Sequence, residues 1–323
     1  MAHSVRQRLK NIADKQGRPF AEVLQWYAIE RFIARLSRTP HAEEMLLKGA
    51  ALLRVWKATP ARPTMDVDLA SSRVLSVEEV IAAVSTCLLA EEEPDGLDFD
   101  LDSIKGEEIR VARRYPGARV RCRGFLGTAR VTLQVDVGFG DRVVPPPVTI
   151  EYPALLSEHG PRVLGYRPET VVAEKLEAIV SLGMKSSRMK DYFDLWWLLT
   201  TKSFDGAETM GAFAATFENR ETPVPGGVPE GLSARVMTDD NKLLQWAAFV
   251  KRMRLDTEVP PLPEVVAIVG GFASPVFEAL RASTGFDLRW NPPVSYTHLT
   301  LPTKIIRCRW GGAAGAGGGG GGG

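Results

Sequence analysis

The spacing of hydrophobic residues predicts helices near the start of the chain. Residues 4–16 and 19–36 carry apolar side chains at intervals of three and four, which is typical of helices with one buried face. Ser76, followed three residues later by Glu79, is the sequence signature of a capping box. A third helix is therefore expected to begin there and to run to about residue 90.

Alternation of apolar and polar residues predicts strands between and after these helices. Residues 65–70, 119–125 and 129–137 alternate in this way, and the last two segments are joined near Gly127 as in a β-hairpin. In the strand 129–137 the valines and the leucine share one face, so Asp136 is expected on the opposite face.

The second half of the chain has a helical pattern. After a loop-rich segment at 141–167, helices are predicted over 168–183, 188–200, 208–218, 240–253 and 263–283. The predicted fold class is α/β (α+β). The expected domains are N-terminal helices over 1–40, an α/β core over 41–160 and a helical domain over 161–293.

The C-terminal segment differs from the rest of the chain. Residues 294–303 read VSYTHLTLPT, which resembles the translation of a sequencing adapter, and residues 311–323 consist of glycine and alanine. Such a composition buries almost no apolar surface. We therefore expect residues 294–323 to be an artefact that is disordered and takes no part in the fold.

Composition narrows the class of protein. The chain has 323 residues, of which 45% are hydrophobic and 24% charged, as in globular proteins. Three cysteines do not form a disulfide framework and fit a reducing cytoplasm. No run of 18 apolar residues is present, so no membrane span is expected. The net charge of +1 argues against a general polyanion binder.

Paired carboxylates give the clearest chemical signal. In the segment RPTMDVDL, strand periodicity places Asp66 and Asp68 on the same face. Neighbouring carboxylates repel unless a positive charge lies between them, and Mg²⁺ or Mn²⁺ is suited to oxygen ligands. If the strand of Asp136 lies beside this one, three acids converge, as phosphoryl transfer requires. An ordinary acidic strand edge is the alternative.

A glycine with small neighbours precedes the acids. Gly49, between Lys48 and Ala50, would let backbone N–H groups approach a phosphate, although close helix packing explains it equally well. Arg62 and Thr64 flank the acids and are candidates to contact a triphosphate or to orient Asp66; the alternative is a turn around Pro63.

Two helices of the second half carry charges beside their apolar positions. Lys175 shares a face with Ile179 and Leu182, which is unfavourable unless its amine meets an anion such as a phosphate or reaches water. In SSRMKDYFDL, Arg188, Asp191 and Asp194 share a face at three-residue spacing. Lys190 is placed to pair with Asp194, so a surface ladder of ion pairs is the alternative to a phosphate site.

These segments together resemble a known family. The order KGAALL, RPTMDVDLA, LQVDVGFGD and ETVVAEKLEAIVSLGMKSSRMKDYFDL is similar to that of the AbiEii nucleotidyltransferase toxins of bacterial abortive-infection toxin–antitoxin systems. The resemblance runs from about residue 4 to residue 290. It implies a polymerase-β-like nucleotidyltransferase core with a helical C-terminal half, and a cognate antitoxin as partner.

The resemblance also implies roles for residues. It places the metal ligands at Asp66, Asp68 and Asp136, the remaining catalytic residues at Lys175 and Asp191, and the nucleotide-binding glycine motif at Gly49 and Ala50. Related sequences often have serine after this glycine, so Ala50 leaves the choice of nucleotide open. The full set of candidate nucleotide contacts is Lys48, Gly49, Ala50, Arg62, Thr64, Lys175, Arg188 and Lys190.

The expected activity is Mg²⁺-dependent transfer of NMP from an NTP to an acceptor, with tRNA as the acceptor that the resemblance suggests. Nucleotidylation of a protein or small molecule, and a non-catalytic NTP-binding module, are the alternatives. An RNA acceptor requires a basic surface. Six arginines between residues 110 and 123 supply one unless they form a solvated hairpin, and they are Arg110, Arg113, Arg114, Arg119, Arg121 and Arg123.

Overall fold

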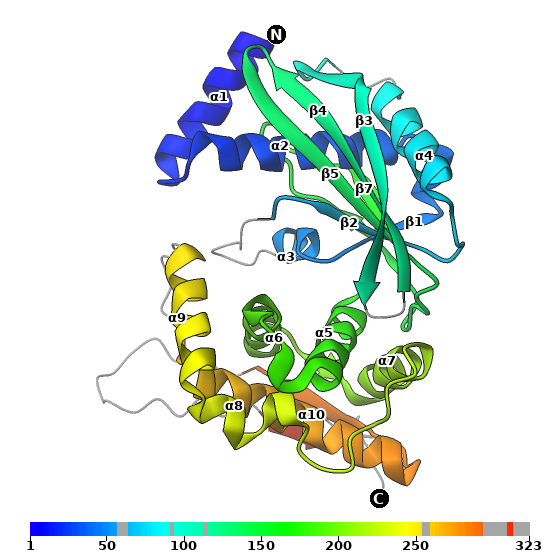
Figure 1. Cartoon of the computed structure of the whole chain (residues 1–323), viewed down its shortest axis with the longest axis vertical. Helices are drawn as coiled ribbons and strands as arrows, with labels where there is room; N and C mark the ends of the chain where they lie inside the picture. Colours follow the sequence, from blue (N-terminus) through cyan, green and yellow to red (C-terminus); the bar gives the residue numbers. More distant parts are fainter. Residues whose placement is uncertain (57–63, 91–93, 113–114, 254–258, 293–308, 313–323) are drawn as a thin grey trace, which may run out of the picture. The chain divides into compact units, whose positions relative to one another are not determined.

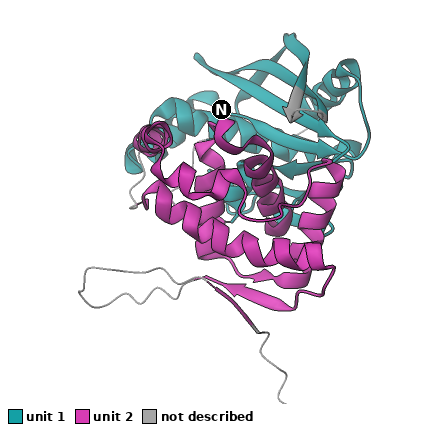
Figure 2. Cartoon of the chain, turned by 60° about the horizontal axis from the view of Figure 1, so that its bottom comes forward, with its two compact units in different colours: residues 1–167, 255–257 teal, residues 168–254, 258–323 magenta. Residues whose placement is uncertain are grey.

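A computed structural model describes residues 1–56, 64–90, 94–112, 115–253, 259–292 and 309–312, without the side chains of residues 110–115. The chain divides into two compact units (Figure 2). Residues 1–167 lie in unit 1, and the chain continues from Pro168 in unit 2. The domain borders expected at residues 40 and 160 stay predictions.

Unit 1 is a mixed β-sheet with helices packed against it (Figure 1). Its helices are α1 (Ala2–Lys15), α2 (Phe20–Leu36), a 3-10 turn (Pro40–Ala42), α3 (Ala51–Val55) and α4 (Val77–Leu89). Its strands are β1 (Met45–Lys48), β2 (Val67–Ser71), β3 (Leu97–Ala112), β4 (Tyr115–Leu126), β5 (Ala129–Phe139), β6 (Val148–Glu151) and β7 (Arg162–Gly165).

The strand order is β3-β4-β5-β2-β1-β7-β6, with β2 parallel to β5, β1 parallel to β7 and the other neighbours antiparallel. The hairpin expected around Gly127 is formed by β4 and β5. The capping box is also present: the Ser76 side chain accepts from the N–H of Glu79, and the Glu79 side chain accepts from the N–H of Ser76.

One face of this sheet is covered by α2 and α4. Leu24 of α2 and Val131 of β5 belong to one buried apolar cluster, together with Leu9 of α1. Because side chains alternate along a strand, Val135 and Val137 share the face of Val131. The polar residues of β5 therefore lie on the face opposite to this core.

The segment 141–167, expected to be loop, contains two strands of the sheet. β7 runs parallel to β1, and β6 pairs with β7. Each strand has only four residues, and a run of three prolines precedes β6. Such short strands take their stability from the sheet that they join and leave little periodicity in the sequence.

Unit 2 is mainly helical. Its helices are α5 (Pro168–Leu182), α6 (Met189–Thr201), α7 (Gly206–Asn219), α8 (Ala234–Thr238), α9 (Asp240–Met253) and α10 (Leu262–Ala282), with 3-10 turns at Gly183–Lys185 and Glu230–Leu232. A small sheet, which was not expected from the sequence, contains β8 (Phe204–Asp205), β9 (Leu288–Asn291) and β10 (Arg309–Gly312).

Strand β10 lies within the segment expected to stay outside the fold. It pairs with β9 in antiparallel register, with Trp310 opposite Trp290. The indole N–H of Trp310 donates to the backbone oxygen of Phe272 at 3.0 Å, and its ring lies 4.8 Å from that of Phe286. For Arg309–Gly312 the structure therefore differs from the expectation, because the aromatic ring of Trp310 has apolar partners in unit 2.

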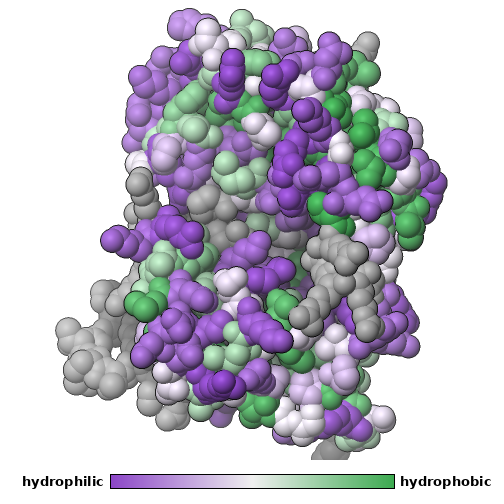
Figure 3. Space-filling model, in the orientation of Figure 1, coloured by the Kyte–Doolittle hydropathy of each residue, from purple (hydrophilic) through white to green (hydrophobic). Residues whose placement is uncertain are grey.

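By length and composition α10 could cross a membrane, but the core helix of a globular protein passes the same test. Val269, Phe272 and Val276 of α10 have no exposed surface in unit 2. Exposed hydrophobic residues such as Val74, Leu89 and Leu244 lie on different segments. On the face drawn in Figure 3, hydrophobic residues are scattered among hydrophilic ones, as on most protein surfaces.

Aromatic packing around α10 predicts the stability of unit 2. Phe272 is fully buried, with ring centroids 5.4 Å from Phe204 and 5.1 Å from Trp290. We expect Phe272→Ala to lower the free energy of unfolding of unit 2 by about 3–5 kcal/mol, because it leaves a cavity. Urea unfolding followed by tryptophan fluorescence measures this. Leu244→Ala, at an exposed site, is the control, and an equal effect of the two substitutions would contradict the prediction.

Candidate active site

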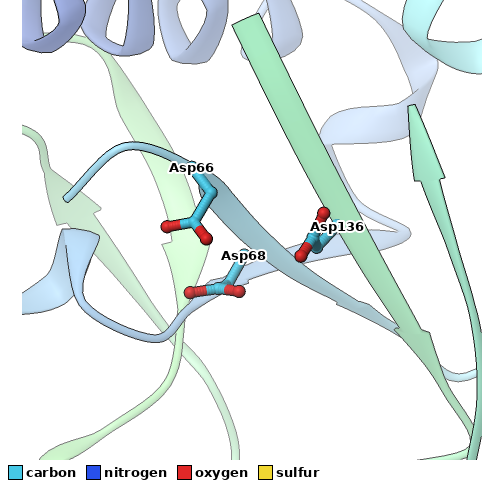
Figure 4. Close-up of side chains that lie close together, drawn as sticks. All are labelled: Asp66, Asp68 and Asp136. Carbon is cyan, nitrogen blue, oxygen red and sulfur yellow. The ribbon is translucent and has the colours of Figure 1, made fainter. Parts of the chain in front are cut away.

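Three carboxylates converge on the sheet of unit 1 (Figure 4). Asp66 directly precedes β2, Asp68 lies in β2, and Asp136 lies in β5. One ligand oxygen from each residue lies within 4.8 Å of the others. The parallel pairing of the strands causes this convergence, since it sets Asp68 opposite Asp136. The condition that the sequence set for convergence, that the two strands are neighbours, is met.

Asp136 is paired with an arginine of the adjacent strand. In the β4–β5 register Arg119 lies opposite Asp136. Its Nε donates to Oδ1 at 2.8 Å and its Nη2 donates to Oδ2 at 2.6 Å, a bidentate geometry that is among the stronger hydrogen-bonded ion pairs. The hydrogen bonds to Asp136 raise the pKa of Arg119, so the guanidinium of Arg119 keeps its positive charge.

Lys48 lies on the other side of the acids. It is opposite Asp68 in the β1–β2 register, and only 6% of its surface is exposed. Its Nζ lies 2.5 Å from Oδ2 of Asp141, which follows β5, and 5.7 Å from the centre of the Tyr166 ring. The amine that the sequence suggested as a nucleotide contact is therefore part of an ion pair within unit 1.

These registers place four charged residues in one line across the sheet. Arg119, Asp136, Asp68 and Lys48 occupy matched positions on β4, β5, β2 and β1. We call this line the charged row. Matched positions on neighbouring strands point to the same face. Two acids therefore lie side by side with one cation at each end of the row.

Gly49 is required by the position of Asp68. Its φ is +70°, a left-handed value that favours glycine, and a Cβ added there would lie 2.0 Å from Oδ2 of Asp68. The glycine of the KGAALL segment thus lets the chain pass close to a metal-ligand candidate. Ala50 is buried and precedes the five-residue helix α3. A phosphate contact at Gly49 or Ala50 stays a prediction.

Two further residues hold the acid-bearing segments. The hydroxyl of Thr64 lies 3.1 Å from both the backbone oxygen and Oδ1 of Asp66, so of its two suggested roles the structure shows contact with Asp66. The side-chain amide of Gln25 in α2 donates to the backbone oxygens of Met65 at 2.8 Å and Thr132 at 3.0 Å. Gln25 therefore connects the segments that carry Asp66 and Asp136. Arg62 lies outside the described residues.

The charged residues predicted on two helices form a buried cluster in unit 2. Nζ of Lys175 on α5 lies 3.0 Å from Asp191 and 2.7 Å from Asp194, both on α6. Nε of Arg188 lies 2.5 Å from the second oxygen of Asp191. Both carboxylates are fully buried. In the described part of unit 2, Lys175 thus meets the carboxylates of Asp191 and Asp194.

The suggested surface ladder of ion pairs is not what α6 forms. Asp194 is buried and paired with Lys175, while Lys190 is exposed. The guanidinium of Arg188 remains 42% exposed although it is tied to Asp191. Among the cations suggested for unit 2, Arg188 and Lys190 are thus accessible to solvent, and Lys175 is largely covered.

The suggested basic surface is largely neutralised by neighbouring side chains. Arg121 donates to Gln134 and Glu107, and Arg123 pairs with Asp100 at 2.8 Å. Arg119 is paired with Asp136. Arg113 and Arg114 lie outside the described residues, and the Arg110 side chain is not described. The described arginines of β4 thus form ion pairs and hydrogen bonds across the strands.

Comparison with protein families shows which family the chain belongs to. The family model described as "Nucleotidyl transferase AbiEii toxin, Type IV TA system" matches residues 31–269, which is most of the chain. The chain belongs to the AbiEii nucleotidyltransferase toxin family. Its enzyme class, nucleotidyltransferase, follows from this membership. Among curated proteins there is no match.

The structure of MenT4 supports the fold. MenT4, a nucleotidyltransferase toxin from Mycobacterium tuberculosis, is 15% identical, with a TM-score of 0.50 over 88% of this chain and 99% of that one. JHP933 from Helicobacter pylori is 16% identical, with a TM-score of 0.47 over 81% of this chain and 94% of that one. At such identity the MenT4 comparison shows the fold alone. The predicted class, an α/β core with a helical second half, is confirmed.

The acids of this AbiEii chain are suited to a divalent cation. Asp66, Asp68 and Asp136 supply only oxygen atoms, which hard cations such as Mg²⁺ and Mn²⁺ prefer. Asp66 and Asp68 are partly exposed, so an ion and a phosphate can reach them. These three residues could therefore hold a metal ion.

Sequence reasoning missed four residues that support these sites: Gln25, Arg119 as partner of Asp136, Asp141 and Asp194 as partner of Lys175. The Arg119 pair was within reach, because counting back from the predicted turn at Gly127 sets residue 119 opposite residue 136. Gln25 and Asp141 gave no such signal, because their partners are distant in the sequence.

The close approach at Gly49 predicts the effect of adding one methyl group. We expect Gly49→Ala to displace the Asp68 side chain and to weaken Mn²⁺ binding by about tenfold or more. Isothermal titration calorimetry measures the affinity. Gly140→Ala is the matched control, because Gly140 has a φ of +76° but no atom within 4 Å of an added Cβ. Equal affinities in the two variants would contradict the steric explanation.

The Lys175 cluster predicts a large effect on stability. Lys175→Met leaves Asp191 and Asp194 buried without their shared cation, so we expect the free energy of unfolding of unit 2 to fall by about 3–5 kcal/mol at neutral pH. Urea unfolding measures this. Lys190→Met, at an exposed lysine of α6, is expected to change stability by less than about 0.5 kcal/mol.

Acid modifies this effect in a defined direction. Burial disfavours ionised Asp191, but the charges of Lys175 and Arg188 outweigh burial and lower the pKa of Asp191 to about 2. An aspartate in an unfolded chain has a pKa of about 3.9. The ion pair therefore stabilises unit 2 above about pH 4, and this contribution is lost as the pH falls towards 2. The deficit of Lys175→Met should shrink over this range, and a constant deficit would argue against the pairing.

Proposed function

We propose that the chain is a Mg²⁺-dependent nucleotidyltransferase toxin that transfers NMP from an NTP to an RNA acceptor, with tRNA as the first candidate. The observation that carries the proposal is the convergence of Asp66, Asp68 and Asp136 at the central strands β2 and β5 of a nucleotidyltransferase fold. Bound Mg²⁺ would supply positive charge that neutralises the triphosphate and activates its α-phosphorus.

Residues of unit 1 are proposed to bind the metal ion, to orient its ligands and to accept a proton. Asp66 and Asp68 are the proposed ligands, and the Thr64 hydroxyl orients Asp66. Asp136, the third acid, is proposed to accept the proton of the attacking acceptor hydroxyl. The acceptor oxygen then bonds to the α-phosphorus, the bond from that phosphorus to the bridging oxygen breaks, and pyrophosphate leaves.

In unit 2 we propose that Arg188 is a phosphate contact. Its exposed guanidinium is oriented by buried Asp191, which is itself held by Lys175. Arginine suits phosphate because its planar group forms paired hydrogen bonds. Lys175 and Asp191, which the resemblance places among the catalytic residues, are on this basis positioning residues.

The proposed partners follow from the family and the chemistry. A toxin–antitoxin family implies a cognate antitoxin, and an NTP is the nucleotide donor. An enzyme that uses NTP and RNA is expected in the cytoplasm. The paired arginines of β4, Arg121 and Arg123, give no support to an RNA-binding surface on that strand.

Labelled nucleotide transfer tests the proposal. The full chain is incubated with Mg²⁺, total bacterial RNA and each α-³²P-labelled NTP in turn. We expect label in a tRNA-sized band and a loss of at least about a thousandfold in Asp66→Ala and Asp68→Asn, because several kcal/mol of charge stabilisation is removed. Asp102→Asn, at an exposed acid of β3, is the matched control and should retain transfer.

Other outcomes distinguish the alternatives. Label on protein or on a small molecule would retain the chemistry and change the acceptor. Transfer that survives in Asp66→Ala would contradict the assignment of the acids. Absence of any transfer, with NTP binding retained, would favour a non-catalytic NTP-binding module.

A further inference from the structure

The three acids of unit 1 differ in what they already bind. Both oxygens of Asp136 accept hydrogen bonds from the guanidinium of Arg119, at 2.8 and 2.6 Å. The contact shown for Oδ1 of Asp66 is with the neutral hydroxyl of Thr64 at 3.1 Å. Asp136 is therefore already paired with a cation of the protein. A second metal ion would have to bind at this same carboxylate.

The bidentate pair restricts what Asp136 can ligate. A carboxylate offers about four lone-pair positions, and a guanidinium that contacts both oxygens uses two of them. Each oxygen of Asp136 therefore already shares its negative charge with Arg119, which makes this carboxylate a weaker ligand for a metal ion while Arg119 stays in place. The positive charge of Arg119 also repels any cation that approaches the same carboxylate.

The formal charges of the charged row and of two acids beside it, Asp66 and Asp141, point the same way. The ionised acids Asp66, Asp68, Asp136 and Asp141 carry four negative charges, and the cations Arg119 and Lys48 carry two positive ones. Among these described residues the remaining formal charge is −2. A divalent cation at Asp66 and Asp68 would offset negative charge that these named residues leave.

We propose that Arg119 is a built-in counter-ion that occupies Asp136 and limits the nucleotide-free protein to a single divalent cation, held through Asp66 and Asp68. This inference rests on the proposed function, because it requires a metal ion at Asp66 and Asp68. Arg119 acts through Asp136 and is a positioning residue. A second cation then binds only when the triphosphate supplies negative charge.

Direct counting of bound ions tests the proposal. Mn²⁺ is titrated into the full chain without nucleotide, and free Mn²⁺ is followed by electron paramagnetic resonance. We expect about one Mn²⁺ per chain in the wild type and about two in Arg119→Gln, which frees Asp136. Arg119→Lys retains the charge and should remain near about one.

Two further variants separate this role from a structural one. The double variant Arg119→Gln/Asp136→Asn should return to about one Mn²⁺, because the added site needs the Asp136 carboxylate. Arg121→Gln removes an arginine two residues along the same strand that pairs with Glu107 instead, and it should also bind about one. Circular dichroism confirms that each variant is folded.

A wrong role for Arg119 and a wrong metal site would give different results. Two Mn²⁺ in the wild type, or an unchanged count in folded Arg119→Gln, would overturn the role of Arg119 and leave the proposed metal site standing. Absence of Mn²⁺ binding in the wild type, or binding that persists in Asp66→Ala, would contradict the metal site itself.

Discussion

Asp68 and Asp136 lie opposite each other on the parallel strands β2 and β5, on the same face of the sheet. Like charges at such a distance repel, and the core on the other face prevents either strand from shifting by one residue to separate them. The surrounding structure supplies the compensation. Arg119 and Lys48 flank the acids in the charged row, and Gly49 gives Asp68 the space that it occupies.

The same physical rule, that carboxylates in the structure need nearby cations, applies in unit 2. Asp191 and Asp194 are fully buried, and their positions are tolerable because Lys175 lies between them and Arg188 contacts Asp191. In both units carboxylates are held by cations of the protein rather than left to solvent. The difference lies in exposure, since Asp66 and Asp68 remain partly open while the acids of α6 do not.

The sequence predicted several long helices and one hairpin because their periodicity is strong. Helices α2, α5 and α10 and the β4–β5 hairpin follow directly from their apolar patterns. Strands β6, β7 and β9 have four residues each, and their formation depends on neighbours that are distant in the chain. The pairing of β2 with β5 is likewise non-local, so the convergence of the acids could be stated only as a condition.

For the site residues, the sequence indicated types but not partners. Lys175, Asp191 and Asp194 were recognised as charges on particular faces, yet which acid met which base depended on the packing of α5 against α6. The arginines of β4 illustrate the same limit. Their density suggested a basic surface. In the structure, Glu107 and Asp100 of β3 form ion pairs with Arg121 and Arg123 of the neighbouring strand β4.

The steric restriction at Gly49 has a genetic consequence for a member of a toxin family. Every amino-acid substitution of a glycine adds at least a Cβ, and at this position that atom would lie 2.0 Å from Oδ2 of Asp68. Codon 49 is therefore a broad target for inactivation, since any missense change there disturbs a proposed metal ligand. Cells selected for survival during expression of this gene should yield escape alleles at codon 49 with varied replacements, whereas a codon tolerant of small side chains would yield few.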